Sequence, residues 1–432
     1  MTGPTGTVSP TDGHSPAQQH RADGYTPADR RHGVALCLSG GGFRSVLYHL
    51  GALTRLNELG LLSQVEVISC VSGGSIVGAV LADRFPRWPT PGTAVPTSEW
   101  QDRVVAPLVA FTQRDLRTGP ILRRLRPVNW FRRSAAVLGL VDHYFTELSR
   151  LDLADLPLSP RYIFSSTDLV FGVDFTFERT RMGSYRSGYY TDVPRDWTVA
   201  RAVAASSCFP PVFSPLPVGL PVAGYIGGMT DGGYEPARRG NIAGIELSDG
   251  GVYDNLGLEP VWKEARTLLV SDGGAPFSVT TDRGLLWRLK RYTDITSNAA
   301  GSLRKRWLVA GYVDHSFDGA FWGISSTATH YAEGAPGYPE ELVRECIARI
   351  RTDLDAFSDA EVGVLQNHGY ALADAAAAVH LGHLPQLPTP FALPHPEWAD
   401  PERVGTALAG SDRRSILGRE SVWKLFGKAV RG

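Results

Sequence analysis

The sequence predicts an α/β protein whose central sheet is mostly parallel and covered by helices on both faces. Three observations lead to this class: a continuous apolar run at Gly33–Leu38, two early strand-to-helix turns, and later apolar runs that alternate with helical stretches. The chain has 432 residues, enough for one large domain with tails or for two domains. Apolar residues make up 43% and charged residues 20%, so most of the chain is expected to be globular.

The elements are expected in the following order. Residues 1–31 are rich in Gly, Pro, Thr, Ser and His without apolar periodicity, which predicts a disordered tail. The first strand is expected at Gly33–Leu38, and leucines spaced by three predict a helix at Val46–Leu59. Further strands are expected at Tyr162–Ser166, Asp174–Glu178 and Thr267–Ser271.

The C-terminal part is expected to differ from the rest. Five prolines between residues 381 and 398 predict a linker, and Arg413–Arg431 has the spacing of a short basic amphipathic helix. The predicted organisation is therefore a tail over 1–31, a folded domain over 32–380, and a linker with a basic segment over 381–432.

Composition also limits the partners and the cellular compartment that can be expected. The net charge of −1 provides no general attraction to nucleic acid. The four cysteines are far apart and form no C-x-x-C pair, which favours a reducing cytoplasm over a disulfide framework or a zinc site. No apolar stretch reaches the ~20 residues needed to span a bilayer, and the N-terminus lacks the pattern of a secretory signal.

Ser72 is the first candidate catalytic residue. It lies in the run Val65–Ala79, where β-branched residues lead into a small-residue turn and a helix-like stretch follows. This is the layout of a nucleophile elbow, a sharp turn that exposes a serine hydroxyl at the edge of a sheet. Gly73 and Gly74 are small enough for such a turn, whereas Cys70 stands where the usual G-x-S-x-G pattern has its first glycine. An ordinary serine-rich turn before a helix would have the same composition.

Gly40, Gly41 and Gly42 form another such turn upstream, between the first predicted strand and the first predicted helix. Consecutive glycines leave backbone N–H groups bare, and the helix adds its positive end, so the loop suits an anion or a developing oxyanion. Nucleotide binding is the competing use, but a dinucleotide fingerprint would need glycine at Ser45, and a P-loop would need Gly-Lys-Ser/Thr. A tight turn for close helix–strand packing also explains the glycines.

Arg44 begins the helix that follows, where the helix dipole disfavours a cation. Contact with a phosphate or a carboxylate would explain its position, and so would simple exposure to solvent. Arg44 is therefore a possible phosphate contact, with the exposed interpretation left open.

The base for Ser72 is more easily found among aspartates than among histidines. Three late histidines have no telling neighbourhood: His315, His330 and His368. The tripeptide Asp-Gly-Gly occurs three times, beginning at Asp231, Asp249 and Asp272. Glycines beside an aspartate allow its carboxylate a close approach to another loop, but local composition does not choose among the three.

Taken in this order, the glycine loop, the serine turn and the late Asp-Gly-Gly resemble the patatin-like phospholipases, in particular bacterial members. The resemblance covers roughly residues 33–375, and the context of Asp249 is a closer match than those of Asp231 and Asp272. Further similar segments are Gly51–Leu53, Ser165–Leu169, Ala204–Phe213, Asp249–Asn255 and Arg351–Ser358. The resemblance implies a three-layer α/β/α patatin-like catalytic domain over 32–380.

The resemblance also implies a Ser–Asp dyad that needs no histidine, metal or organic cofactor. Ser72 would attack an ester carbonyl of a membrane lipid, and Asp249 would accept its proton. The loop Gly40–Gly42 would hold the oxyanion, chiefly through the N–H groups of Gly41 and Gly42, each such donor being worth about 2.7–4 kcal/mol. Because a carboxylate with a reference pKa of ~3.9 is a weak base, Asp249 would need partial burial and a direct hydrogen bond.

The implied activity is that of a phospholipase A or lysophospholipase, a carboxylic ester hydrolase (EC 3.1.1) acting through an acyl-enzyme. Its partners would be a phospholipid or lysophospholipid substrate and a membrane surface, with a cytoplasmic location at the inner face of the membrane. Arg114–Arg133 and Arg413–Arg431 mix arginines with apolar residues and are candidate membrane contacts, although each also fits a solvated helix face.

Two alternatives remain at this level. Some bacterial patatin-like proteins degrade membranes when a nucleotide signal binds, and the same chemistry here could depend on such a ligand. A non-catalytic protein of the same fold could use the glycine loop only to hold phosphate. The sequence does not specify the oligomeric state.

Overall fold

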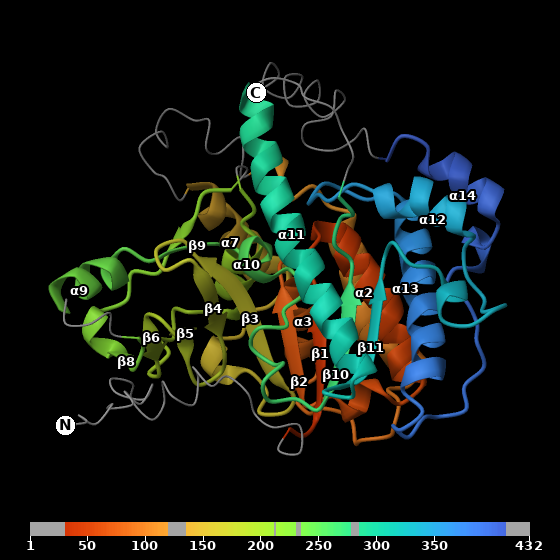
Figure 1. Cartoon of the computed structure of the whole chain (residues 1–432), viewed down its shortest axis with the longest axis horizontal. Coiled ribbons are helices and arrows are strands. Elements are labelled where there is room, and N and C mark those ends of the chain that lie inside the picture. The colour runs from red at the N-terminus through yellow and green to blue at the C-terminus, as the bar shows by residue number, and fades with distance from the viewer. Residues whose placement is uncertain (1–30, 120–134, 211–212, 230–234, 278–284, 412–432) are drawn as a thin grey trace, which may run out of the picture.

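The computed structural model describes residues 31–119, 135–210, 213–229, 235–277 and 285–411 (Figure 1). Within them an 11-stranded sheet has the order β11-β10-β1-β2-β3-β4-β5-β6-β8, and β9 pairs with both β3 and β7. The strands are β1 (Val34–Leu38), β2 (Val67–Val71), β3 (Arg161–Asp168), β4 (Val173–Phe177), β5 (Met182–Ser184), β6 (Gly188–Tyr190), β7 (Leu216–Pro217), β8 (Tyr225–Ile226), β9 (Glu246–Asp249), β10 (Thr267–Asp272) and β11 (Asp318–Gly323).

The sheet has a parallel half and an antiparallel half. The strands from β11 to β3 are parallel neighbours, and the pairs from β3 to β8 are antiparallel. The four strands expected from apolar runs are all present, with boundaries shifted by at most two residues. The helices are α2 (Gly42–Glu58), α3 (Gly73–Arg84), α4 (Thr97–Trp100), α5 (Ala106–Thr112), α7 (Ala135–Glu147), α8 (Val199–Ser207), α9 (Glu235–Ala243), α10 (Gly251–Asp254), α11 (Leu285–Val313), α12 (Glu340–Glu345), α13 (Asp359–His380) and α14 (Pro401–Leu408).

Helices cover the parallel half of the sheet on both faces. α2, α3 and α13 pack on one face, and α11 runs diagonally across the other (Figure 1). The side chains of β1 alternate between two buried clusters: Leu36 and Leu38 belong to the first, and Ala35 and Cys37 to the second. Burial on both faces explains why parallel strands have continuous apolar sequences, and it confirms the predicted layered α/β class.

Helix α2 begins at Gly42, four residues before the predicted start, because the glycine loop itself leads into the first turn. The helix is almost entirely buried under α13. A Cβ atom at Gly51 would lie 1.9 Å from the carbonyl oxygen of Gln366, and one at Gly369 would lie 2.0 Å from that of Tyr48. Glycine on each helix therefore lets the two backbones pack in direct contact.

The proline-rich segment 381–398 packs against the domain, in contrast to the predicted linker. The Leu387 N–H donates to the carbonyl oxygen of Leu59 at 2.9 Å, and Arg55 Nη2 donates to that of Thr389 at 2.9 Å. These bonds fasten the segment to the end of α2, where the extended proline-rich backbone has carbonyl groups free for donors from the helix. The predicted tail 1–31, except Arg31, and the basic segment Arg413–Arg431 lie outside the described residues.

Candidate active site

Ser72 occupies the turn between β2 and α3, as the elbow pattern predicts. Its backbone has φ 51° and ψ −114°, a region that costs a residue with a side chain on the order of 1–3 kcal/mol. A Cβ at Gly73 would lie 2.3 Å from the carbonyl oxygen of Gly42, and one at Gly74 would lie 2.2 Å from that of Leu38. These two glycines therefore allow the serine turn to lie directly against the glycine loop.

Cys70 fits the turn although the usual pattern has glycine at this position. Its side chain is fully buried and lies beside α3, where a Cβ at Gly78 would be only 2.4 Å from the sulfur. The sulfur thus fills the space left by the glycine at position 78. Burial raises the pKa of the Cys70 thiol, which keeps it neutral.

Sheet register brings Asp249 to Ser72. Strand β3 pairs with β2 as far as Val71 opposite Ser165, and its next residue, Ser166, pairs with Asp249 of β9. Strand β9 therefore occupies the position beside β3 that β2 leaves when it turns at Ser72. No local sequence pattern contains this information, because residues from two distant segments are aligned by a third strand.

The two side chains form a direct hydrogen bond. Ser72 Oγ donates to Asp249 Oδ2 at 2.7 Å, and the Gly251 N–H donates to Oδ1 at 2.8 Å. Ser72 and Asp249 are 5% and 7% exposed, so the pair reaches solvent only at its edge. Burial raises the pKa of Asp249 to about 6, and the two hydrogen bonds partly oppose this rise. A carboxylate with this pKa is a stronger base than an exposed aspartate.

The glycine loop lies beside this pair, because a Cβ at Gly40 would lie 3.1 Å from the Ser72 Cβ. Gly41 and Gly42 have φ of 150° and 59°, which glycine adopts readily. Among the described residues, no acceptor is found for their N–H groups. Gly40 differs, because its N–H donates to the carbonyl oxygen of Asn255 at 3.1 Å. Of the three predicted loop glycines, Gly41 and Gly42 thus have N–H groups available to an oxyanion.

Arg44 does not lie where the exposed or phosphate-binding interpretation would put it. Its side chain is 1% exposed, and its Nε and Nη2 donate to the carbonyl oxygen of Gly273 at 3.1 and 2.9 Å. Its Nη1 donates to the carbonyl oxygen of Ile350 at 2.9 Å. Burial lowers the pKa of Arg44 to about 10, which leaves it charged at neutral pH. Three bonds to carbonyl oxygens explain this cation at a helix start without any external anion.

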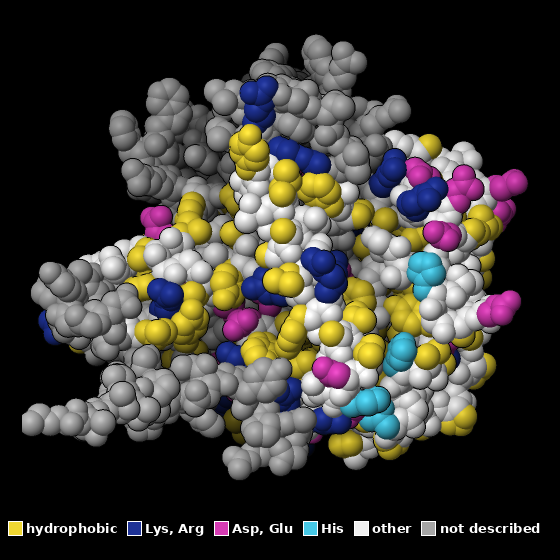
Figure 2. Space-filling view, in the orientation of Figure 1, with side chains coloured by type: hydrophobic (Ala, Val, Ile, Leu, Met, Phe, Trp, Pro, Cys, Tyr) yellow, Lys and Arg dark blue, Asp and Glu magenta, His cyan; other side chains and the backbone are white. Residues whose placement is uncertain are grey.

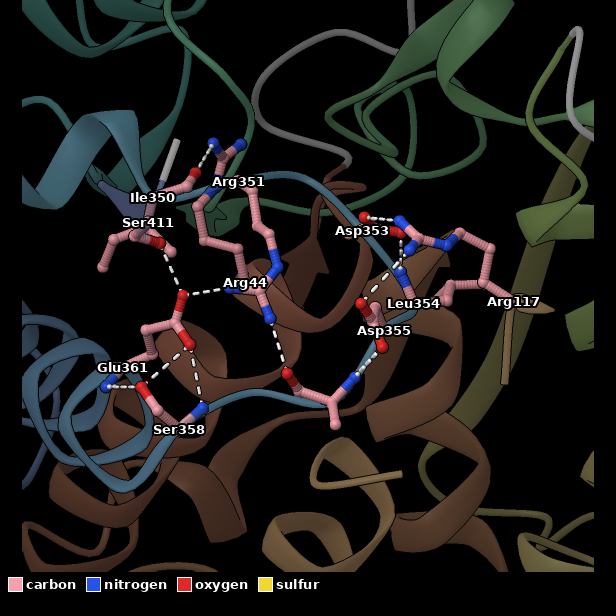
Figure 3. A network of polar contacts seen from close by, with 11 residues as sticks. Arg44, Arg117, Ile350, Arg351, Asp353, Leu354, Asp355, Ser358, Glu361 and Ser411 are labelled. Atoms are coloured by element: carbon pink, nitrogen blue, oxygen red, sulfur yellow. Dashed lines mark hydrogen bonds and ion pairs between the residues drawn. The ribbon is translucent and has the colours of Figure 1, made fainter. Parts of the chain in front are cut away.

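A buried ionic network contacts the end of the glycine loop, where α2 begins (Figure 3). Arg117 pairs with Asp353 and, at 3.1 Å, with Asp355. The carbonyl oxygen of Asp353 accepts the Phe43 N–H at 2.9 Å, and a Cβ at Gly42 would lie 2.6 Å from the same oxygen. The late segment Arg351–Ser358, noted in the sequence only for its resemblance, therefore fixes the start of α2.

Ser206 of α8 connects the turn that carries Ser72 to the segment that carries Asp249. Its Oγ accepts the Ser72 N–H at 2.8 Å and donates to the carbonyl oxygen of Ser165 at 2.6 Å. Its own carbonyl oxygen accepts the Gly250 N–H at 3.1 Å. The sequence marked the segment Ala204–Phe213 as similar to the family but gave no reason to single out this serine.

Asp272, His49 and His368 have partners other than Ser72. Asp272 pairs with Lys305 Nζ at 2.5 Å, and Asp231 lies outside the described residues. The His368 ring forms a hydrogen bond with the carbonyl oxygen of Ile324. His49, which the sequence analysis did not consider, bonds to Ser271 Oγ and to the carbonyl oxygen of Ser39, and burial lowers its pKa to about 4.

A polar cavity of about 360 Å³ begins at Gly251, whose N–H donates to Asp249; Ser72 and Asp249 themselves do not line it. Gly251 and Asn255 contribute to its wall, and Lys305 lines it from α11. Gly251 and Asn255 both belong to residues 249–255, which include α10 and are called the aspartate loop. Asn255 lies close to three glycines: a Cβ at Gly40 or Gly251 would come within 2.5 Å of its Oδ1, and one at Gly274 would lie 2.8 Å from its Nδ2. The cavity therefore begins where the glycine loop and the aspartate loop meet.

The predicted membrane contacts are largely outside the described part of the chain. Of Arg114–Arg133, residues 120–134 are not described, and Arg117 is buried in its pair with Asp353. Residues 412–432 are not described either. Where the chain is described, none of its helices is both long enough and apolar enough to cross a membrane.

The fold and the site together define a class of protein. It is an α/β protein with a serine at a strand-to-helix turn and a carboxylate that accepts a hydrogen bond from the serine hydroxyl. The model of the patatin-like phospholipase family matches residues 36–262, more than half of the chain. The chain therefore belongs to the patatin-like phospholipase family, and the three-layer patatin-like fold predicted from its motifs is confirmed.

Solved structures with a similar fold are distant in sequence. Human GIVD cytosolic phospholipase A2 is 12% identical with a TM-score of 0.42, over 89% of this chain and 60% of that one. VipD from Legionella pneumophila is 14% identical with a TM-score of 0.34, over 81% of this chain and 67% of that one. The chain thus spans less than two thirds of the human protein. No curated protein sequence matches it.

Proposed function

We propose that the chain is a serine lipid acyl hydrolase that cleaves carboxylic esters of phospholipids or lysophospholipids with Ser72 as nucleophile and Asp249 as base. The observation that carries this proposal is the 2.7 Å hydrogen bond from Ser72 Oγ to Asp249 Oδ2, made by a buried pair at a strained turn. A serine at an ordinary turn has no need of positive φ or of a buried carboxylate partner.

The reaction follows from this geometry in two halves. Ser72 Oγ attacks the ester carbonyl carbon while its proton passes to Asp249 Oδ2, and the N–H groups of Gly41 and Gly42 bind the negative oxygen that forms. Collapse of the tetrahedral intermediate breaks the ester bond, and the proton on Asp249 passes to the departing lipid alcohol. Water then attacks the acyl-serine and gives its proton to Asp249, which returns it to Ser72 as the fatty acid leaves.

Burial of Asp249 supports its role as the base. A pKa of about 6 is roughly two units above the ordinary value, which brings it closer to neutral operating pH while leaving the group mostly ionised there. The Gly251 N–H holds the other carboxylate oxygen, so that Oδ2 stays directed at the serine hydroxyl.

A panel of lipid classes tests the proposal. Hydrolysis of phospholipid, lysophospholipid, triacylglycerol and a soluble short-chain ester is measured with the wild type, Ser72→Ala and, as a matched control, Ser98→Ala at an exposed position. We expect fatty acid release from the phospholipids, its loss in Ser72→Ala and its retention in Ser98→Ala. Full activity of Ser72→Ala would refute the mechanism.

The same panel separates the proposal from its alternatives. Parallel assays with added nucleotides show whether activity depends on such a ligand. Labelling with a fluorophosphonate probe distinguishes a hydrolase from a phosphate-binding protein of the same fold, because a glycine loop used only for binding would leave Ser72 unlabelled.

A further inference from the structure

Helix α11 has an unusual distribution of side chains. It is 29 residues long, about 43 Å, and its outward side carries five exposed apolar residues at helical spacing: Tyr292, Ile295, Leu303, Val309 and Val313. We call these five residues the outer stripe. Leu303 and Val313 are 64% and 75% exposed, so water covers most of each side chain. Figure 2 shows apolar and basic side chains gathered along this helix.

Where α11 faces the cavity, its side chains are polar. Asp294, Asn298 and Lys305 line the cavity beside Gly251 and the rest of the aspartate loop. Along the cavity the helix therefore has polar side chains toward the domain, whereas an ordinary surface helix turns apolar side chains toward the core. A surface helix with an outward apolar side is expected to meet a second apolar surface.

Near its C-terminal end, α11 is packed against the domain. Trp307 contacts Trp262 and Phe317 with ring centroids 5.0 and 5.2 Å apart, and Leu308 is fully buried. The Tyr312 hydroxyl donates to the carbonyl oxygen of Leu268. From Tyr292 to Ala300, by contrast, all side chains except Asp294 are exposed. The outer stripe is therefore presented by a helix anchored at one end.

Charge identifies the kind of surface that would match. α11 contains six Lys or Arg residues and a single acidic residue, Asp294, and two of the cations, Arg304 and Lys305, pair with Asp254 and Asp272 of the domain. Arg306 is exposed among the apolar residues of the outward side. Cations mixed with an exposed apolar stripe are typical of helices that lie in the interface of an anionic bilayer.

We propose that the outer stripe of α11 docks on an anionic lipid surface. The inference rests on the proposed function, because a hydrolase of membrane lipids must reach its substrate in the bilayer. Docking would hold the cavity beside the Ser72–Asp249 pair about one helix diameter, roughly 10 Å, from the lipid headgroups. The sequence analysis expected membrane contact elsewhere, since outward exposure of apolar residues on this helix is not visible in the sequence.

The test compares vesicle binding with catalysis on a soluble ester. The variant Ile295→Gln/Leu303→Gln removes apolar area from the stripe with residues that favour helices. The control is Leu158→Gln, because Leu158 is 81% exposed and precedes β3, at the strand edge opposite the candidate active site. Binding is measured by co-sedimentation with vesicles of phosphatidylcholine and phosphatidylglycerol in equal amounts, at low and high salt.

We expect the double variant to lose roughly ten- to a hundredfold in vesicle partition, since two partly exposed aliphatic side chains no longer enter the bilayer. Wild-type binding should weaken as salt is raised, and Leu158→Gln should bind as the wild type does. All three proteins should hydrolyse the soluble ester at similar rates in a Ser72-dependent manner. Failure of that last reaction would count against the proposed function rather than against docking.

Two outcomes would overturn the inference. The first is unchanged vesicle binding by Ile295→Gln/Leu303→Gln while Leu158→Gln also binds normally. The second is a lipid-free wild type that is dimeric by light scattering and becomes monomeric in the double variant, which would make the outer stripe a contact between copies of the chain.

Discussion

Two aspartates in identical Asp-Gly-Gly turns have opposite electrostatic surroundings. Asp249 ends β9 and Asp272 ends β10, and in both turns one carboxylate oxygen accepts the N–H of the second glycine, at 2.8 and 2.9 Å. The other oxygen differs: in Asp249 it accepts the Ser72 hydroxyl, and in Asp272 it pairs with the Lys305 ammonium.

The partner of that second oxygen decides the proton affinity of each carboxylate. Burial raises the pKa of Asp249 to about 6, because a neutral hydroxyl compensates little of the lost hydration. Burial acts on Asp272 as well, but the adjacent ammonium outweighs it and lowers the pKa of Asp272 below its usual value. The same turn thus holds a candidate base in one place and, in the other, a structural carboxylate that is ionised at neutral pH.

The largest expected effect separates the two turns directly. Asp249→Asn should lower kcat on a soluble ester by at least about a thousandfold, because the amide cannot accept the serine proton. Asp272→Asn should lower it by less than about tenfold, since Lys305 is partly exposed and can be hydrated. Steady-state kinetics with circular dichroism as a folding control measure this difference. Equal losses in both variants would remove the distinction.

Arg44 tests whether the Asp272 turn acts through structure. Arg44→Gln leaves the buried carbonyl oxygens of Gly273 and Ile350 without their donors, and we expect unfolding free energy to fall by about 2–4 kcal/mol. kcat should fall roughly tenfold or more, because the loop beside Gly41 loses its support. Denaturant unfolding and kinetics report the two changes. Loss of lipid affinity with full stability would instead favour a phosphate contact.

The pH dependence of kcat should reflect the titration of Asp249 and not that of Asp272. The base must be ionised, so kcat is expected to fall as pH drops through about 6 and to be about tenfold below its plateau at pH 5. Asp272 remains ionised over this window, because its pKa is lowered. Any stability that it contributes is lost only when pH falls below the usual aspartate range. A midpoint that moves by a unit or more in Asp272→Asn would contradict this assignment.

The smallest expected effect concerns Cys70, which stands where the usual elbow pattern has its first glycine. Cys70→Gly restores the usual elbow pattern, and we expect kcat to change by less than about threefold, because the sulfur lies beside Gly78 and away from the nucleophile. Unfolding free energy should fall by about 1–2 kcal/mol through the lost buried side chain and the added backbone freedom. A large gain in kcat would show that Cys70 distorts the turn.

Sequence reasoning succeeded where a local pattern encodes a local structure. Apolar runs placed β1, β3, β4 and β10, and small residues at Gly73 and Gly74 indicated the turn at Ser72. The family resemblance selected Asp249 from three equivalent tripeptides, a choice that composition alone did not make. The hydrogen bond between Ser72 and Asp249 agrees with that selection.

The remaining features depend on contacts between distant segments. The burial of Arg44, the role of Ser206 beneath the Ser72 N–H and the support of Phe43 by Asp353 all join residues far apart in the chain. Residues 381–398 likewise have the composition of a linker, and only their bonds to α2 reveal a packed segment. Such contacts arise from tertiary packing, which composition and periodicity do not record.

The identity of the nucleophile and its base is tested most directly by fluorophosphonate labelling followed by peptide mass spectrometry. We expect stoichiometric labelling of Ser72 in the wild type, none at that position in Ser72→Ala, and labelling at least about a hundredfold slower in Asp249→Asn than in Asp272→Asn. Labelling of a different serine, or equal rates in the two aspartate variants, would contradict the Ser72–Asp249 dyad.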